Sequence, residues 1–244
     1  MSSGSPMGKA AKVLPLFFAV CIAAAALALP LPGAAQDTER AKIPDASGRD
    51  VPNLSGKWVN SSPMIGLKTI DGKSPPLNDK GTALYAVHSA HPDSDPIRLC
   101  QLHGEPRLLY TTYPFLILQY AKHVDFIHEP NHIFRLVNFG AELAPDADPV
   151  WLGNSSAKWD GDTLVIDSIT YNDKTWLDYK GLPHSDQLKT QERYTLAADG
   201  KSINGVVVID DPEYYTKPWS TAFTLKKLSG FSLREFICED NHKM

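Results

Sequence analysis

The stretch VDFIHEPNHIFRLVN, residues 124–138, decides the fold class of this sequence. It holds two runs in which apolar and polar residues alternate, Val124–His128 and Ile133–Asn138, on either side of Glu129-Pro130-Asn131. A period of two is typical of β-strands, and a short segment with Pro and Asn is typical of a turn. We therefore expect two antiparallel strands joined by a tight turn.

Similar signals recur along most of the chain. Asp160-Gly161 and Asp199-Gly200 indicate two further tight turns. Outside the first hairpin, the expected strands are Leu54–Val59, Arg107–Thr111, Phe115–Tyr120, Ser156–Trp159, Thr163–Thr170, Gln191–Leu196, Ile203–Ile209, Trp219–Lys227 and Leu233–Cys238. About ten short strands with little helix predict an all-β domain from residue 54 to the end, a barrel or a sandwich. A closed barrel has the advantage that no strand edge stays open.

Two segments interrupt the strand pattern. Pro75-Pro76-Leu77-Asn78 predicts the start of the one expected helix, with Asn78 as its N-cap, and the helix ends before residues 91–96. Residues 171–189 form a long polar and aromatic loop without a period. Long irregular loops in a compact β domain are usually functional or disordered, and the aromatic residues argue against disorder here.

The composition is that of an ordinary globular protein with one domain. The 244 residues include 24 Lys+Arg and 28 Asp+Glu, which gives a formal charge of −4. A nucleic-acid-binding protein would show a basic excess, so we expect no nucleic-acid partner.

The first 35 residues have the anatomy of a secretory signal peptide. Lys9 and Lys12 precede the apolar run Val13–Leu31, and small residues lead to Ala35. The apolar run approaches the length of a membrane span, so an uncleaved anchor is the alternative. We expect cleavage after Ala35, export to the periplasm or the cell exterior, no membrane span in the mature chain, and a flexible lead-in over residues 36–53.

Cleavage at that point changes the charge and the cysteine count. It removes two positive charges, so the mature charge is −6, and it leaves Cys100 and Cys238. Two cysteines in an exported chain predict one disulfide. A bridge that closes a loop of 138 residues stabilises the fold by roughly 4–5 kcal/mol in the chain-entropy model. A metal site is the alternative, although no C-x-x-C spacing supports it.

Several blocks of sequence carry a resemblance from about residue 54 to the end. Gly56-x-Trp58 is similar to the start of lipocalin-type barrels. The other blocks are Tyr113-Pro114-Phe115, His132-x-Phe134-Arg135, Trp159-x-Gly161-Asp162, Thr175-Trp176-Leu177-Asp178, Pro183-His184-Ser185-Asp186, Glu192-Arg193-Tyr194, Tyr215-Thr216-Lys217-Pro218-Trp219 and Cys238-Glu239-x-Asn241. Together they resemble a widespread, mostly uncharacterised family of exported bacterial proteins. The resemblance implies an antiparallel, lipocalin-like (calycin-type) barrel and no settled activity.

The densest group of candidate catalytic residues lies in the long loop. Asp173, Asp178, His184, Ser185 and Asp186 fall within fourteen positions. His184 is the candidate acid or base, oriented by Asp186 or Asp173, because histidine titrates near neutral pH. The alternative is structural, since such residues also cap turns and bind backbone amides.

A second group of candidate residues lies in and near the hairpin of residues 124–138. His132 and Arg135 lie on opposite faces of one strand, and Tyr113 and Phe115 precede them. Both faces carry apolar residues, so alternation leaves the inward face open. An inward Arg135 must bind a carboxylate, either Glu192 or one on a ligand, because a buried unpaired charge is costly.

Other chemistries have weak support in the sequence. His123, His128 and His132 lie within ten positions around Asp125, but no H-E-x-x-H spacing accompanies them, so we expect no metal. Ser185 lacks a G-x-S-x-G elbow, and no G-x-G-x-x-G motif follows a strand. We therefore expect no cofactor.

Aromatic residues suggest where a ligand binds. Tyr215 and Trp219 flank Lys217-Pro218, and Trp176 lies in the long loop, so these rings are candidates for the mouth of a barrel.

These patterns lead to an exported barrel that binds a small apolar, aromatic or polycyclic molecule. The favoured activity is cofactor-independent acid–base catalysis by a lyase or isomerase, with a hydrolase as the weaker option. His184 with Asp186 or Asp173 is the proposed acid–base group, and Arg135 with His132 is the proposed electrophilic pair. The alternatives are a carrier without catalysis and a structural envelope protein with a filled barrel. The sequence does not predict the oligomeric state.

Overall fold

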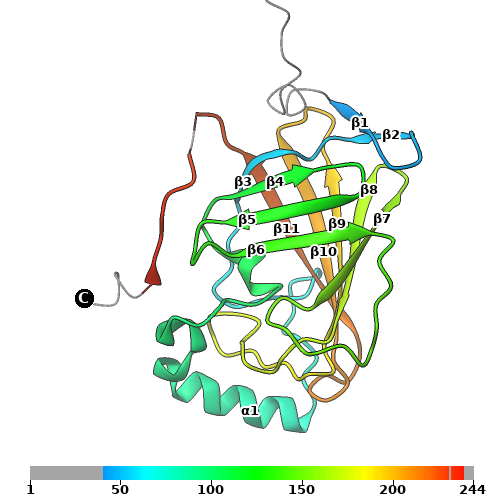
Figure 1. The fold of residues 1–244 in the computed structure, drawn as a ribbon. Coiled ribbons are helices and arrows are strands. Elements are labelled where there is room, and N and C mark those ends of the chain that lie inside the picture. The colour runs from blue at the N-terminus through cyan, green and yellow to red at the C-terminus, as the bar shows by residue number, and fades with distance from the viewer. Residues whose placement is uncertain (1–40, 231, 239–244) are drawn as a thin grey trace, which may run out of the picture. The chain divides into compact units, whose positions relative to one another are not determined.

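The computed structural model describes residues 41–230 and 232–238, so the expected signal peptide lies outside the described residues. Nine of the described strands form a closed barrel, which confirms the expected barrel architecture (Figure 1). These strands are β3 (Gly56–Asn60), β4 (Phe115–Gln119), β5 (His123–His128), β6 (Phe134–Phe139), β7 (Asn154–Asp160), β8 (Thr163–Ile169), β9 (Lys189–Leu196), β10 (Ser202–Asp210) and β11 (Trp219–Lys227). Strands β3 to β11 follow one another around the barrel in chain order, and β11 pairs with β3 to complete the ring.

One pair of neighbouring strands is parallel, whereas a wholly antiparallel barrel was expected. Strand β6 pairs with β7 in parallel, with Asn138 opposite Ser156 and Phe139 opposite Ala157. The number of strands is the reason. Each antiparallel pairing reverses the strand direction, so a ring with an odd number of strands cannot be antiparallel throughout. A ring of nine needs at least one parallel seam, and residues 140–153 make the crossing that this seam requires.

Three segments differ from the expected secondary structure. Arg107–Tyr110 forms a short 3-10 helix, η3, and not a strand, and all four of its residues are buried. Leu233–Cys238 is not a strand; Phe236 forms an isolated β-bridge with Pro130 in the turn after β5. The expected lead-in contains a small hairpin of β1 (Lys42–Pro44) and β2 (Asp50–Pro52).

The expected helix is present and covers one end of the barrel. Helix α1 (Asp79–Ala90) begins after Asn78, whose side chain accepts a hydrogen bond from the amide of Gly81 at 2.8 Å. The ring of His88 stacks on Trp176 with 4.6 Å between centroids, so α1 holds the long loop of residues 171–188 (Figure 1). Two further 3-10 helices, η1 (Pro92–Ser94) and η2 (Pro96–Leu99), follow. Along the described part of the chain, no helix is both long and apolar enough to cross a membrane.

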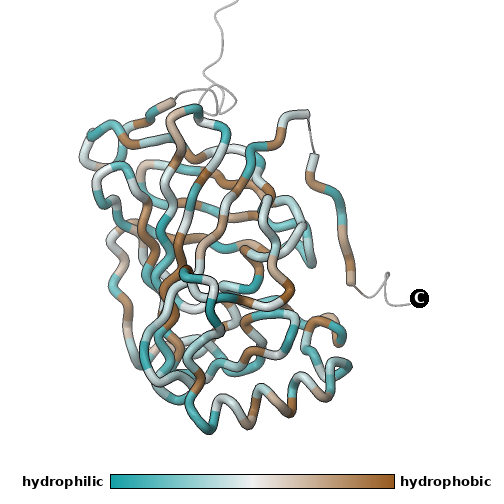
Figure 2. The backbone as a smooth tube through the Cα atoms, turned by 180° about the vertical axis from the view of Figure 1, so that it is seen from behind, coloured by the Kyte–Doolittle hydropathy of each residue, from teal (hydrophilic) through white to brown (hydrophobic). Residues whose placement is uncertain are grey.

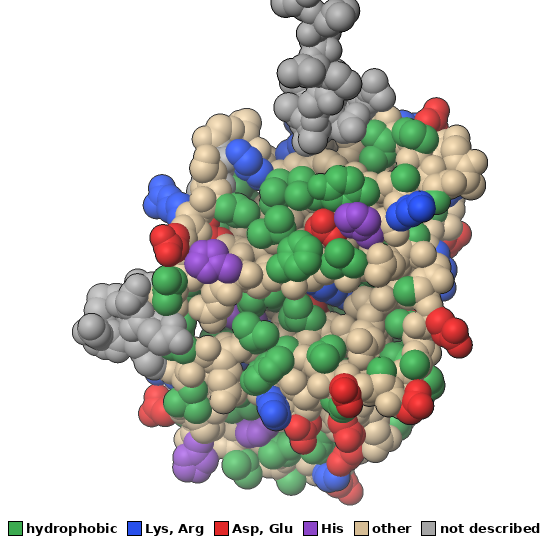
Figure 3. Space-filling model, viewed as in Figure 1, with side chains coloured by type: hydrophobic (Ala, Val, Ile, Leu, Met, Phe, Trp, Pro, Cys, Tyr) green, Lys and Arg blue, Asp and Glu red, His purple; other side chains and the backbone are tan. Residues whose placement is uncertain are grey.

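Buried and less buried residues alternate along several strands, among them β6, β9 and β10. Figure 2 shows that hydrophobic and hydrophilic residues also change place along the strands. In β6, Arg135 and Val137 are buried in the interior, whereas Phe134 and Leu136 are exposed. The face of β6 that contains Arg135 therefore points into the barrel, which the sequence alone did not show. With Tyr120, the two exposed residues belong to a hydrophobic area over β4 to β6 (Figure 3).

The structure joins Cys100 and Cys238 in a disulfide, which confirms the expected bridge. The backbone amide of Cys238 also donates to the side-chain oxygen of Asn131 at 3.2 Å. The ring of Phe236 lies 5.2 Å from that of Tyr113. The C-terminal segment is therefore held to the turn after β5 and to the segment that precedes β4.

Candidate functional site

A buried ion-pair cluster lies inside the barrel, centred on Arg135. Its guanidinium donates two hydrogen bonds to Glu192, Nη1 to Oε2 at 3.1 Å and Nη2 to Oε1 at 2.8 Å. Nη2 also donates to the hydroxyl oxygens of Ser155 at 3.1 Å and Ser168 at 3.0 Å. The hydroxyl of Tyr194 donates to Glu192 Oε2 at 2.5 Å. Arg135 and Glu192 are 4% and 0% exposed, so this pair is shielded from water.

A second carboxyl group approaches the same guanidinium. Glu105 Oε1 lies 3.5 Å from Arg135 Nη1, and Glu105 is 2% exposed. Burial raises the pKa of Glu105 to about 8; Arg135 opposes this rise, and the nearby Glu192 adds to it. Glu105 is therefore mainly a neutral carboxylic acid at pH 7, which leaves one carboxylate to balance one guanidinium.

Several polar atoms around this cluster have no partner. Among the described residues, the buried atoms Glu105 Oε2, Arg135 Nε, His128 Nε2 and His103 Nδ1 make no hydrogen bond. Buried polar groups are usually satisfied, so a gathering of unsatisfied ones calls for an explanation such as a bound molecule. Burial lowers the pKa of His128 to about 3, with added effects of Arg135 and His103, so its ring is neutral.

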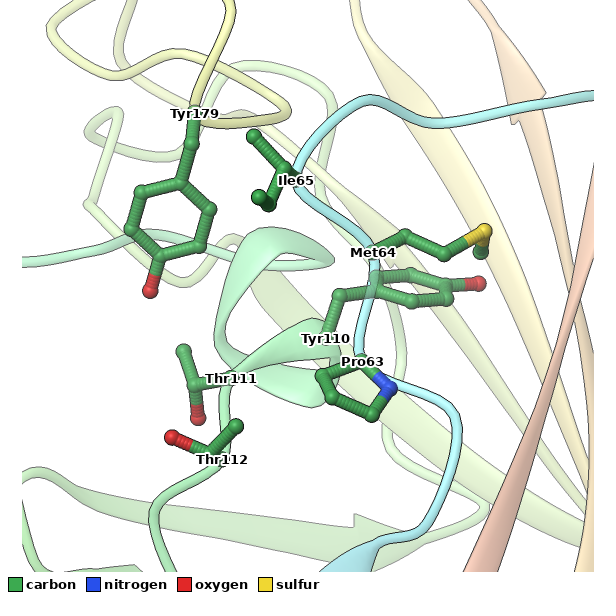
Figure 4. Close-up of a pocket in the computed structure, with 7 residues that line it drawn as sticks. All are labelled: Pro63, Met64, Ile65, Tyr110, Thr111, Thr112 and Tyr179. Carbon is green, nitrogen blue, oxygen red and sulfur yellow. The ribbon is translucent and has the colours of Figure 1, made fainter.

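An apolar pocket of about 510 Å³ lies between the segment after β3, η3 and the long loop (Figure 4). Its lining consists of Pro63, Met64, Ile65, Tyr110, Thr111, Thr112 and Tyr179. Met64 and Ile65 come from the segment after β3, Tyr110 ends η3, and Tyr179 comes from the long loop. A volume of this size suits a small organic molecule.

Tyr110 connects the pocket with the buried cluster. Its ring lines the pocket, and in Figure 4 its hydroxyl points away from Tyr179, toward the barrel strands. The ring packs edge-on against Phe223 of β11 at 6.3 Å, and Phe223 packs against Tyr194 at 5.2 Å. Burial raises the pKa of Tyr110, and the nearby Glu192 and Glu105 add to that rise. Tyr110 therefore belongs both to the pocket lining and to the aromatic packing of the barrel interior.

The candidate residues of the long loop do not form an open catalytic site. His184 is 4% exposed, and both ring nitrogens are engaged. Nδ1 donates to the carbonyl of Ser185 at 3.1 Å, which leaves Nε2 to accept from the hydroxyl of Thr175 at 2.6 Å. Burial lowers the pKa of His184. Asp173 and Asp186 are exposed. The described hydrogen bonds of His184 go to Thr175 and Ser185 and not to either aspartate.

Other polar residues of this loop hold its own backbone. Asp178 accepts hydrogen bonds from the amides of Leu67, Lys180 and Leu182 at 2.8–3.0 Å. Ser185 donates through its amide and its hydroxyl to Asp211, at 2.6 and 2.8 Å. These contacts favour the structural interpretation of the loop, and a catalytic role for His184 stays a prediction.

The remaining candidates are spread over separate places. His132 is exposed in the turn before β6 and lies apart from the cluster that contains Arg135. Phe115 stacks on His128 at 4.8 Å in the core, and Tyr113 packs on Phe236. None of these residues lines the apolar pocket.

The rings expected at a barrel mouth also lie away from this pocket. Trp176 stacks on His88 of α1. The hydroxyl of Tyr215 donates to the carbonyl of Pro183 at 2.8 Å, and its ring lies 5.6 Å from Trp219. Trp219 lines a smaller hollow, of about 370 Å³, beside Lys217 and Pro218. Of the eleven candidate catalytic and ligand-binding residues, the structure brings together Arg135 and Glu192 in one ion pair.

The histidines considered for a metal also point to different places. His123 Nδ1 lies 2.9 Å from Asp125, His128 is buried in the barrel, and His132 is exposed. Within residues 41–230 and 232–238, no three His, Cys, Asp or Glu side chains are placed to hold a metal ion.

Sequence reasoning missed the residues that complete the site. Glu105 lies in irregular chain before η3, where no periodicity marks an inward side chain, and Tyr110 lies in η3, where a strand was expected. The one signal at Glu105 is its position between Gly104 and Pro106, which indicates a constrained backbone. Met64 and Ile65 likewise follow β3 without a motif.

Comparison with known proteins adds no identification. No protein-family model matches the chain, and no curated protein sequence is similar to it at a significant level. The resemblance to a family of exported bacterial proteins therefore stays a prediction.

Proposed function

We propose that this protein binds a small, largely apolar molecule, with the ring body of the ligand in the pocket between Tyr110, Met64 and Tyr179. The observation that carries the proposal is an apolar pocket of about 510 Å³ whose lining includes the polar side chains of Thr111, Thr112 and Tyr179. Ligand sites are typically apolar hollows with a few polar groups at one end. Export and a lipocalin-like way of binding belong to the same proposal, although nine strands with one parallel seam depart from the antiparallel barrel implied by the resemblance.

The neutral fluorescent dye N-phenyl-1-naphthylamine tests this proposal. Ile65 is 70% exposed at the rim of the pocket, so Ile65→Asp adds a carboxylate there with little cost to the fold. We expect this variant to bind the dye at least tenfold more weakly, because an apolar ring does not compensate a desolvated charge. Val87 on α1 is 56% exposed and does not line the pocket, so Val87→Asp is the matched control and should bind normally. Equal dye affinity in both variants contradicts the proposed pocket.

Acid–base catalysis, by a lyase or isomerase without a cofactor, is the second candidate function. The observation that favours it is the burial of Glu105 3.5 Å from the guanidinium of Arg135, where burial raises the pKa of its carboxyl to about 8. A group with a pKa near the working pH is suited to proton transfer. His184, the acid–base residue expected from the sequence, has no comparable access, because both of its ring nitrogens are bonded.

Proton exchange on a ring ketone tests the catalytic candidate. In heavy water, an enzyme of this kind should exchange the α-protons of 2-tetralone faster than buffer alone, as followed by NMR. Glu105→Gln should abolish the excess rate and His184→Gln should keep it. Binding of 2-tetralone without excess exchange favours a carrier instead.

A further inference from the structure

We propose that the edge of β6 that faces β7 is a docking site for an extended segment of a partner protein, which adds to the barrel wall as a further strand. The inference concerns the outer wall of the barrel and is independent of the apolar pocket. It rests on the backbone groups and exposed side chains of Phe134 and Leu136, and on the charge of the segment that borders them.

The first observation concerns the direction of backbone groups along β6. The amide of Phe139 donates to the carbonyl of Lys122 at 2.9 Å, at one end of the β5–β6 pairing. A residue in an antiparallel pair bonds to the same neighbour at every second position, so Arg135 also bonds to β5. The amides and carbonyls of Phe134 and Leu136 therefore point away from β5, toward the side of β7.

The second observation is that this side of β6 is left open. Strand β6 pairs with β7 at its last two residues, and the two strands diverge toward the start of β6 (Figure 1). The segment of residues 140–153, which joins the two strands, bonds elsewhere: the amide of Val150 donates to the carbonyl of Thr170 at 3.0 Å. Within the described part of the chain, no backbone group pairs with the outward amides and carbonyls of Phe134 and Leu136. An open strand edge is a template for another strand.

The side chains along this edge specify the pattern of the partner. Phe134 and Leu136 are 53% and 45% exposed on the outer face. Arg135 lies between them, points inward and donates to the hydroxyl oxygen of Ser155 at 3.1 Å. Residues that lie opposite each other on neighbouring strands project to the same face. The partner therefore has apolar residues that point outward and, between them, small polar residues that point inward.

The number of strands favours one direction for the partner. A ring of nine cannot be antiparallel throughout, and its parallel seam lies between β6 and β7. A strand added there brings the count to ten, so it can run antiparallel to both of its neighbours. Antiparallel pairs are slightly more stable per residue than parallel ones. The partner segment accordingly runs antiparallel to β6, and its apolar residues exchange hydrogen bonds with Phe134 and Leu136.

The charge beside the edge adds a further requirement. The segment that joins β6 to β7 contains Glu142, Asp146 and Asp148 and no Lys or Arg. All three acidic residues are exposed. The ammonium of Lys174 lies over the ring of Trp151 at 5.9 Å, so the net charge of this border stays negative. A partner with Lys or Arg at both ends of its apolar stretch complements that charge.

The available area argues against a second copy of this chain as the partner. Tyr120, Phe134 and Leu136 are about half exposed, and with about 200 Å² for a whole aromatic side chain they offer about 300 Å² together. A stable dimer needs roughly 800 Å² from each partner. An extended segment needs less, because main-chain hydrogen bonds supply much of its affinity.

A fluorescently labelled synthetic peptide, Lys-Val-Thr-Val-Thr-Val-Lys with blocked ends, tests the inference by fluorescence anisotropy. It combines alternating apolar and small polar residues with a basic residue at each end. We expect saturable binding to the protein, and binding at least fivefold weaker when both lysines of the peptide are replaced by glutamates. Absence of saturable binding up to about 1 mM protein, or equal binding of the two peptides, overturns the inference.

One variant of the protein removes a single group from the edge. Leu136→Pro deletes the amide N–H that points outward and keeps the pairing with β5, and proline is tolerated on such edges. Peptide binding should weaken about fivefold to tenfold, the effect of about one hydrogen bond. Tyr120→Ser is the matched control, because it removes an exposed ring of the same hydrophobic area on β4's side and should leave binding unchanged. Equal weakening in both variants indicates general adhesion to that area and contradicts the docking edge.

The peptide provides a second measurement if circular dichroism shows that Leu136→Pro is unfolded. N-methylation of the valine amides blocks donation to β6 and should weaken binding at least tenfold, whereas methylation of the threonine amides, on the opposite edge of the peptide, should weaken it less. Equal effects refute the inferred pairing. Sedimentation of the protein alone tests the other occupant: self-association that Leu136→Pro abolishes would assign the edge to a second copy and refute the choice of partner.

Discussion

Replacing Arg135 by methionine tests the central feature of the barrel interior. The substitution keeps an unbranched side chain of similar reach but leaves Glu192, which is 0% exposed, with Tyr194 as its remaining donor. The hydroxyls of Ser155 and Ser168 lose the guanidinium as well. Removing one partner of a buried ion pair typically costs about 3–5 kcal/mol. With a urea dependence of about 2 kcal/mol per M, the midpoint should fall by about 2 M.

The assay is equilibrium unfolding in urea, followed by tryptophan fluorescence with the disulfide intact. Arg193→Met is the matched control, because Arg193 lies next to Glu192 in the chain but forms an exposed ion pair with Asp160 at 2.6 Å. Such exposed pairs contribute about 0–1 kcal/mol. The double variant Arg135→Met with Glu192→Met should recover part of the loss, since it removes the uncompensated carboxylate.

The pH dependence of this deficit has a definite sign. Without Arg135, the folded state holds a proton on Glu192 more readily than the unfolded chain does. The folded variant therefore binds more protons, and its deficit should shrink as the pH falls from 7 toward 5. A deficit for Arg135→Met no larger than that for Arg193→Met would refute the account of a buried, energetically coupled pair.

Three further predictions concern the fold around the site. Because burial lowers the pKa of His128 to about 3, the unfolded chain takes up a proton before the folded one does; stability should fall as the pH drops from 6.5 toward 3, and His128→Gln should flatten that decline in acid titrations. Gly205→Ala should lower stability by about 1–3 kcal/mol in thermal unfolding, because the added methyl group meets the ring of Phe223, which forms the support of the pocket wall. Cys100→Ser with Cys238→Ser should cost roughly 2–5 kcal/mol in urea unfolding, and a loss below 1 kcal/mol would contradict a stabilising bridge.

Local patterns predicted the nine barrel strands and helix α1, because their signals lie within a few residues, but they also predicted strands at Arg107–Thr111 and Leu233–Cys238, where the structure has none. Alternation located β5 and β6, and Asn78 was recognised as the cap of α1. The disulfide followed from the count of cysteines in an exported chain. When both faces of a strand carry apolar side chains, alternation does not show which face points into the barrel. The inward position of Arg135 could therefore be learned only from the tertiary structure.

The rest of the site depends on packing between distant segments. Glu105 approaches Arg135 because an irregular segment passes beneath the barrel, and no repeat in the chain specifies that path. The parallel seam between β6 and β7 depends on the total number of strands in the ring, which no single segment contains. Conversely, the residue type of His184 and its acidic neighbours in the sequence suggested catalysis. In the structure its two ring nitrogens bind Thr175 and the carbonyl of Ser185, so its hydrogen bonds stabilise the loop.

The pairing of β3 with β11 has a consequence for the order of folding events. Trp58 lies opposite Lys227 in that pairing, so the two partners are 169 positions apart in the chain. The pairs β4–β5, β5–β6, β7–β8, β9–β10 and β10–β11 join neighbouring segments through short loops. The β3–β11 pair instead joins the first and last strands of the barrel. Contacts of such long range slow folding, to milliseconds or longer in β-rich domains. During synthesis, β3 therefore waits as an open edge until residue 227 has emerged, and a chain truncated before β11 should be an aggregating sheet rather than a smaller barrel.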